Sequence, residues 1–100
     1  LATPETAPNA IFCAKDHIAL GLLDAARFEL GLRIPEDIAV VGFDDIAAAR
    51  QGAYQLTTVC QSATKLAEMT VDRLRQRIRG DALTDQRLIL PVEMTRRRTA

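Results

Sequence analysis

Two adjacent carboxylates, Asp44 and Asp45, directly follow the apolar run Ile38–Phe43 and are the residues best placed to do chemistry. A run rich in β-branched residues, with no polar alternation, is typical of a strand buried on both faces of a parallel sheet. In open parallel sheets, ligands bind just beyond the carboxyl ends of the strands. Because a carboxylate accepts hydrogen bonds from hydroxyl groups in two directions, we interpret Asp44 as a contact for a small polar ligand that is held and not converted.

Lys15 follows a second predicted strand, Ala10–Ala14, which is expected to end at the same edge of the sheet. Lys15 is interpreted equally well as a second ligand contact or as a solvated loop residue. For Asp44, the structural alternative is a turn cap. Asp16 is a favourable N-cap for the helix that follows, so its predicted role is structural.

The chain lacks the residue patterns of common catalytic sites. His17 is the only histidine, no G-x-S-x-G sequence presents a serine, and Gly42 and Gly52 stand alone instead of forming a phosphate-binding loop. A Mg²⁺-dependent phosphoryl-acceptor site at Asp44 and Asp45 is an alternative, but adjacent residues of a strand point to opposite faces. The sequence therefore predicts a binding protein, with no enzyme activity, metal or cofactor.

The composition is that of one small globular domain with no electrostatic preference for a class of partner. Thirteen lysines and arginines balance thirteen aspartates and glutamates among 100 residues, so no general attraction to nucleic acid or to membranes is encoded. No apolar stretch is long enough to span a bilayer. Cys13 and Cys60 lie in apolar surroundings, which indicates buried, reduced thiols and a cytoplasmic protein.

Strands and helices are expected to alternate along the chain. Further strands are predicted at Leu56–Val59, Leu88–Leu90 and Val92–Thr95. Helices are predicted at His17–Leu30, which Gly31 ends, and at Ser62–Arg79, which Gly80 ends, with a short helix or turn at Ile46–Arg50. The segment 81–86 is expected to be a polar loop, and Arg96–Arg98 a solvated tail.

Both predicted helices are amphipathic. The buried face of the first is expected to hold Ile18, Ala19, Leu22, Leu23, Ala25, Ala26 and Leu30. Leu20 and Phe28 fall on its polar side, which favours a partner surface there. The second helix carries one apolar stripe, formed by Ala63, Leu66, Ala67, Thr70, Val71, Leu74 and Ile78. We expect this stripe to be covered by self-association or by an altered packing of the helix.

Several motifs, in order and spacing, resemble the C-terminal part of lactose-repressor (LacI/GalR) family transcription regulators. The resemblance covers nearly the whole chain, from about Asn9 to Thr99. The motifs are Ala10–Asp16 with Ala19–Gly21, Gly31–Ile38, Val40–Asp45, Leu56–Val59 with Gln61, and Leu90–Thr99.

The resemblance implies a type I periplasmic-binding-protein-like fold, in which two α/β subdomains joined by three crossovers enclose a small effector. It places residues 9–57 and 88–100 in the C-terminal subdomain, 58–61 in a crossover and 62–80 in a helix of the N-terminal subdomain. Operator DNA would be bound by a helix-turn-helix headpiece outside this chain. Effector binding would change the angle between the subdomains and so bias DNA affinity. A periplasmic sugar receptor, which shares the fold, is the alternative.

The resemblance also implies roles for individual residues. Asp44 corresponds to the family's effector-contacting aspartate, and Gln61 to a position close to the cleft. Lys15 stands where the family usually has asparagine, and its ammonium favours an anionic or acidic ligand. The helix that carries Leu20 and the region 46–54 correspond to the dimerisation surface of the family. The residues assigned to that homodimer surface are Leu20, Asp24, Phe28, Ala47, Arg50 and Gln51.

Overall fold

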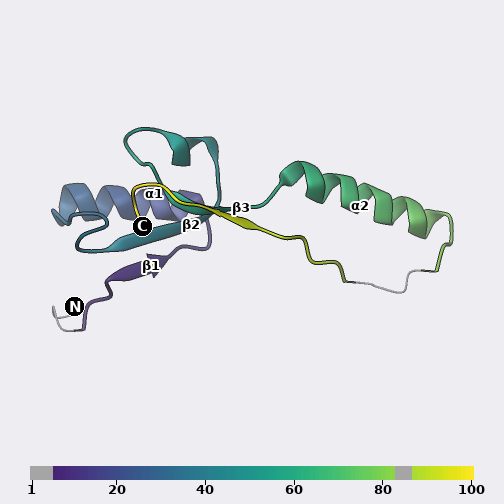
Figure 1. The fold of residues 1–100 in the computed structure, drawn as a ribbon, viewed down its shortest axis with the longest axis horizontal. Helices are drawn as coiled ribbons and strands as arrows, with labels where there is room; N and C mark the ends of the chain where they lie inside the picture. Colours follow the sequence, from purple (N-terminus) through teal and green to yellow (C-terminus); the bar gives the residue numbers. More distant parts are fainter. Residues whose placement is uncertain (1–5, 83–86) are drawn as a thin grey trace. The chain divides into compact units, whose positions relative to one another are not determined.

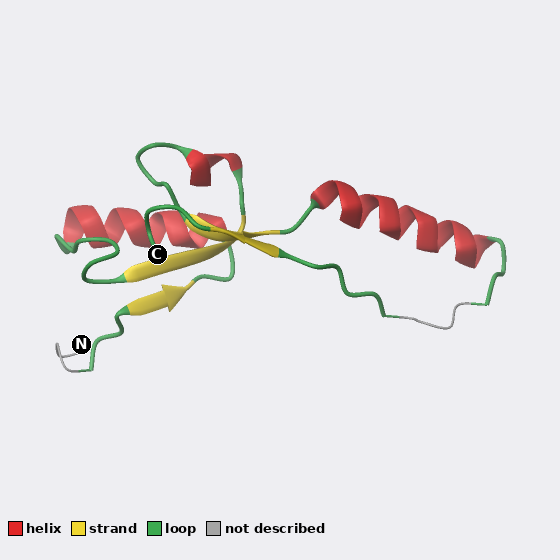
Figure 2. Cartoon of the chain, in the orientation of Figure 1, coloured by secondary structure: helices red, strands yellow, loops and turns green. Residues whose placement is uncertain are grey.

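A computed structural model describes residues 6–82 and 87–100. It contains a four-stranded sheet with the order β1 (Ala10–Phe12), β2 (Ala39–Asp44), β3 (Thr57–Cys60) and β4 (Glu93–Thr95), drawn in Figures 1 and 2. β1 pairs with β2 in parallel, and β2 pairs with β3 in parallel. The predicted α/β fold with a parallel sheet is therefore confirmed.

β2 is the central strand that the apolar run predicted. It lies between β1 and β3, and Val40 is completely buried. The helix α1 (Asp16–Asp24) packs against β2 and continues as a π-helix, η1 (Ala25–Glu29). Gly31, which follows with a φ of +63°, ends the helix in the left-handed conformation that glycine adopts most easily.

The core lies between α1 and the sheet. Its buried apolar residues are Cys13, Ala19, Leu23, Val40, Ala49 and Leu56. The buried face of the helix is narrower than predicted, because Ile18 and Leu30 are exposed. Leu20 was expected on the polar side, yet it is half-buried and packs against this core, whereas Phe28 is 82% exposed.

The connection from β2 to β3 contains the predicted short helix as a 3-10 turn, η2 (Ala47–Arg50). Ala49 is buried in the core, and its carbonyl accepts a hydrogen bond of 2.9 Å from the amide of Leu56. This contact brings the chain back to the sheet just before β3 begins. The predicted third strand is thus confirmed, one residue later than expected.

The C-terminal segment is part of the sheet's hydrogen-bonding network. The solvated tail expected at Arg96–Arg98 is wrong at Arg97, whose side chain is 13% exposed and donates to the Leu56 carbonyl at 2.8 Å. The hydroxyl of the fully buried Thr99 donates to the Val40 carbonyl at 2.7 Å and accepts from the Thr57 amide at 2.8 Å. The amide of Val40 in turn donates to the Thr99 carbonyl. Figure 1 shows this yellow segment returning beside β2. The tail therefore joins β2 to β3.

The strand predicted at Leu88–Leu90 does not form; the only strand near Pro91 is β4. Proline has no backbone N–H to donate to a ladder, which is consistent with pairing that begins only beyond it. Of the predicted loop 81–86, residues 83–86 lie outside the described part of the chain.

The chain divides into two compact units, residues 1–60 with 94–100 and residues 61–93. The second unit contains α2 (Ala63–Ile78), capped by Ser62, whose hydroxyl accepts the Lys65 amide at 3.1 Å. Gly80 ends it with a φ of +78°. None of the residues of α2, all of which are described, is buried, so its apolar stripe is open. Among the described residues, no helix combines the length and the apolar content needed to cross a membrane.

Candidate functional site

The parallel pairing of β1 with β2 places Lys15 and Asp44 at one edge of the first unit. Phe12, the last residue of β1, is in register with Val41 of β2, and Asp44 is the last residue of β2. Lys15 is exposed, has an extended backbone and immediately precedes α1. Asp44 is half-buried. Because the carboxyl ends of parallel strands meet at the same edge, an ammonium and a carboxylate are presented on one rim.

The backbone turns sharply at the end of β2. Asp44 has a φ of 132° and Asp45 a φ of 60°, so two consecutive non-glycine residues have positive φ. Aspartate tolerates the left-handed region better than most residues, but such conformations still cost of order 1–3 kcal/mol each. They persist only where surrounding contacts impose them, and they cluster at ligand sites.

The carboxylate of Asp45 is engaged within the first unit. Its Oδ1 lies 2.8 Å from a guanidinium nitrogen of Arg97, its Oδ2 lies 3.4 Å from one of Arg50, and the side chain is only 8% exposed. Burial raises the pKa of Asp45, but the hydrogen bonds and charges of Arg97 and Arg50 outweigh burial, so the net pKa is lowered. Asp45 is therefore a structural carboxylate, and a two-aspartate metal site would have to compete with two arginines for it.

Asp16 has a structural role different from the one predicted. The N-cap of α1 is Lys15, without a side-chain capping bond, and Asp16 is the first helical residue. The fully buried carboxylate of Asp16 accepts the Thr58 hydroxyl at 2.6 Å and the Ile46 amide at 2.9 Å. It thus connects α1 to β3 and to the turn after β2.

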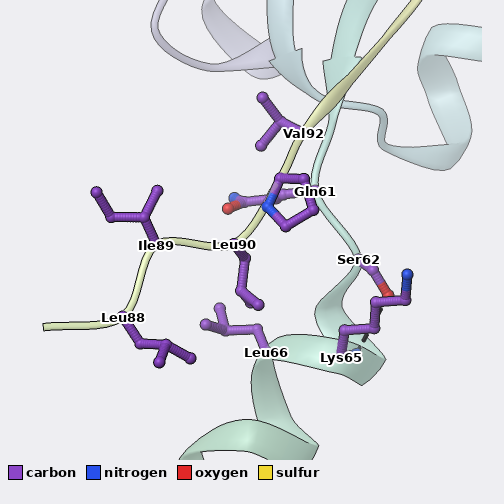
Figure 3. A pocket seen from close by; sticks show the side chains of 9 residues that line it. Gln61, Ser62, Lys65, Leu66, Leu88, Ile89, Leu90 and Val92 are labelled. Carbon is purple, nitrogen blue, oxygen red and sulfur yellow. Dashed lines mark hydrogen bonds between the residues drawn. The ribbon is translucent and has the colours of Figure 1, made fainter. Parts of the chain in front are cut away.

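Gln61 follows β3 and belongs to the second unit, where it lines a groove of about 290 Å³. Figure 3 shows Gln61, Ser62 and Lys65 supplying the polar groups of this groove. Its apolar walls are Leu66 of α2 and the segment 88–92. The structure places Asp44 and Lys15 in one unit and Gln61 in the other, and the three remain predicted ligand contacts.

The residues predicted to form a dimer surface lie on α1, η1 and the η2 region. The Tyr54 hydroxyl donates to Asp24 at 3.2 Å, and a guanidinium nitrogen of Arg27 donates to the Ala53 carbonyl at 2.6 Å. The charge of Asp24 and this hydrogen bond raise the pKa of Tyr54. The two hydrogen bonds connect α1 and η1 to the segment that follows η2. Of the predicted residues, only Leu20 is half-buried, and the exposed ones are Asp24, Phe28, Ala47, Arg50 and Gln51.

Within residues 6–82 and 87–100, no three histidine, cysteine, aspartate or glutamate side chains gather in a way that could hold a metal ion. Cys13 and Cys60 are free thiols. Cys13 is buried, as predicted, and its burial raises the pKa of the thiol. Cys60 is only half-buried.

The sequence as a whole, residues 1–100, matches the family described as "Periplasmic binding protein-like domain". This chain belongs to that family. It is 39% identical over 90 residues to the ribose operon repressor of Haemophilus influenzae, covering 90% of this chain and 27% of that protein. It is 46% identical over 78 residues to the transcriptional repressor PurR of the same species, covering 78% of this chain and 23% of that protein. The chain spans about a quarter of the length of these relatives.

Solved structures agree with this family assignment. The lac repressor dimer bound to operator and the anti-inducer ONPF superposes with a TM-score of 0.83 at 38% identity, over 95% of this chain and 32% of the repressor chain. The predicted periplasmic-binding-protein-like fold and the resemblance to lactose-repressor-family regulators are thereby confirmed.

Proposed function

We propose that this chain is the effector-binding and dimerisation portion of a cytoplasmic, LacI-family DNA-binding transcription regulator. The observation that carries the proposal is the strained strand end at Asp44, which shares an edge with Lys15. The similarity of nearly the whole chain to two repressors supports it. DNA binding belongs to another segment of the longer protein.

The division of the chain into subdomains follows from the resemblance alone. Residues 9–57 and 88–100 form the C-terminal subdomain, 58–61 a crossover, and 62–80 a helix of the N-terminal subdomain. The unit boundary between Cys60 and Gln61 supports a crossover at 58–61, whereas residues 88–93 belong to the same compact unit as α2. An effector held by both subdomains favours one relative orientation, and this differential contact is what allostery requires.

The effector is a hydroxylated small molecule, a sugar or a sugar derivative. Asp44 accepts hydrogen bonds from its hydroxyl groups, since an ionised carboxylate is an acceptor only. Lys15 adds a positive charge that attracts an anionic substituent such as a phosphate. Similarity to the ribose operon repressor, and to a CelR structure described as a cellobiose complex at 33% identity, supports a sugar.

The ligand class is tested by calorimetric titration of the full-length protein with D-ribose, cellobiose and D-ribose 5-phosphate. Lys15→Gln is expected to weaken the phosphate ester about tenfold relative to the neutral sugars, which corresponds to one charged hydrogen bond of about 1.5 kcal/mol. Arg77→Gln, which removes an exposed charge of α2 outside the groove, is the control. Equal losses for neutral and phosphorylated sugars would contradict the role of Lys15. Tight Mg²⁺ binding that Asp44→Asn abolishes would favour the phosphoryl-acceptor alternative instead.

A further inference from the structure

The turn at Asp44 and Asp45 needs an external restraint. Both residues have positive φ, at 132° and 60°, a conformation that side-chain-bearing residues avoid unless neighbouring contacts impose it. The φ of Asp44 sets the direction in which its side chain leaves β2, and the chain that follows constrains this angle where it is held at Asp45. A group that fixes Asp45 therefore also fixes how Asp44 is presented.

The Asp16 carboxylate holds the turn at the Ile46 amide, and Arg97 is the group that holds it at the Asp45 side chain. One guanidinium nitrogen lies 2.8 Å from Oδ1 of Asp45, and the other donates to the Leu56 carbonyl at 2.8 Å. The Arg97 amide donates to the Thr57 hydroxyl, also at 2.8 Å. The side chain is 13% exposed. Hydrogen bonds thus hold both the backbone and the guanidinium group of Arg97. The ion pair therefore holds the Asp45 carboxylate in one position.

The other arginines nearby do not have these contacts. Arg50 reaches Asp45 only at 3.4 Å, and its side chain is 63% exposed, so solvent screens its charge. The backbone amide of Arg98 donates to the Gln55 carbonyl at 2.9 Å. Arg98, exposed and one residue away from Arg97, therefore serves as a matched control.

We propose that Arg97 is a positioning residue for the ligand site, acting through Asp45 to hold Asp44 in its left-handed backbone conformation. The inference rests on the proposed function only in taking Asp44 as the ligand contact. It gives the C-terminal segment, which Figure 1 shows beside β2, a role beyond closing the fold. A lysine at this position keeps the charge and reaches Asp45, whereas glutamine keeps only the ability to donate to Leu56.

The test is an NMR measurement on the full-length protein with labelled aspartates, using the couplings that report φ, in the absence of ligand. Arg97→Met and Arg97→Gln are expected to move Asp44 and Asp45 out of positive φ. Arg97→Lys is expected to restore it, and Arg98→Met to leave it unchanged. Arg97→Gln keeps a polar, similarly long side chain, so the result does not depend on whether the Met variant folds.

Positive φ retained at both aspartates in Arg97→Gln would overturn the inference. The readout needs no ligand, so it separates the two proposals. A φ change in Arg97→Gln together with unaltered sugar binding by Asp44→Asn would contradict the proposed function alone.

Discussion

Asp44 and Asp45 are neighbours in sequence, yet the fold gives them different tasks. The carboxylate of Asp45 forms ion pairs with Arg97 and Arg50, whereas the half-buried Asp44 is the last residue of β2. The apolar run before them predicts a strand end at this point. The partner of Asp45 was not predictable, because Arg97 is 52 residues away and sits among three consecutive arginines that look alike in sequence.

The ion pair of Asp45 makes the free energy of unfolding depend on pH. The pKa of Asp45 is lower in the folded than in the unfolded protein. Its contribution is therefore fully present above the ordinary carboxyl pKa of about 4 and is lost as pH falls through the lowered folded value. Urea unfolding is measured at pH 6 and at pH 3. Between these two pH values the free energy of unfolding is expected to fall less for Asp45→Asn than for the unaltered protein.

The pKa of Asp37 is also lowered in the folded protein, because Asp37 accepts hydrogen bonds from Arg33. It is therefore the control, and Asp37→Asn is expected to leave the Asp45 contribution in place. Identical acid losses for Asp45→Asn and the unaltered protein would show that the pair does not act on stability.

At the scale of elements, β2 and α1 approach closely at one glycine. A Cβ at Gly42 would overlap Oδ1 of Asp16 and lie 2.9 Å from the Leu56 side chain. That oxygen already accepts the Thr58 hydroxyl. The absence of a side chain at Gly42 thus makes room for the buried Asp16 carboxylate, a need that no local pattern in the sequence reveals.

Gly42→Ala is expected to lower the free energy of unfolding by about 2 kcal/mol or more, because overpacking a rigid core displaces the Asp16 network. Gly21→Ala is the matched control. Nothing lies within 4 Å of a Cβ at this helical glycine of α1, so a gain of up to about 1 kcal/mol is expected. Chemical denaturation measures both changes. An unchanged free energy of unfolding in Gly42→Ala would contradict this packing.

Periodicity predicted the larger elements and missed the irregular ones. The repeat of apolar residues predicted α2, and the continuous helical segment formed by α1 and η1, to within one residue at each end, because each spans several turns. The π-helical end of the first helix and the absence of a strand at Leu88–Leu90 were missed. Both depend on backbone pairing, which single-sequence patterns encode weakly.

In the described part of the chain, the apolar stripe of α2 and one side of η1 both carry large exposed apolar side chains. Leu66, Val71, Leu74 and Ile78 are all exposed, as is Phe28. Large contiguous apolar patches of this kind are typical of surfaces that pack against further protein. The family assignment is consistent with a longer protein that covers them.

If the full-length protein forms the proposed homodimer, Phe28→Glu is expected to raise its dissociation constant at least tenfold, because a charge would be buried at the predicted dimer surface. Sedimentation velocity over a concentration series measures this shift. Arg33→Glu, an exposed change in the turn outside that surface, is expected to leave the equilibrium unaltered. A Phe28→Glu protein that remains dimeric would remove Phe28 from the interface.

Calorimetry of the full-length protein with and without the charge of Asp44 tests most directly whether Asp44 contacts a sugar effector. D-Ribose, cellobiose and D-ribose 5-phosphate are titrated into the unaltered protein, Asp44→Asn and the exposed control Asp81→Asn. At least one sugar is predicted to bind the unaltered protein. Asp44→Asn is predicted to weaken that binding about 10- to 100-fold, the effect of losing a charged hydrogen bond of about 1.5–3 kcal/mol. An Asp44→Asn protein that binds the same sugar with unchanged affinity would contradict the account.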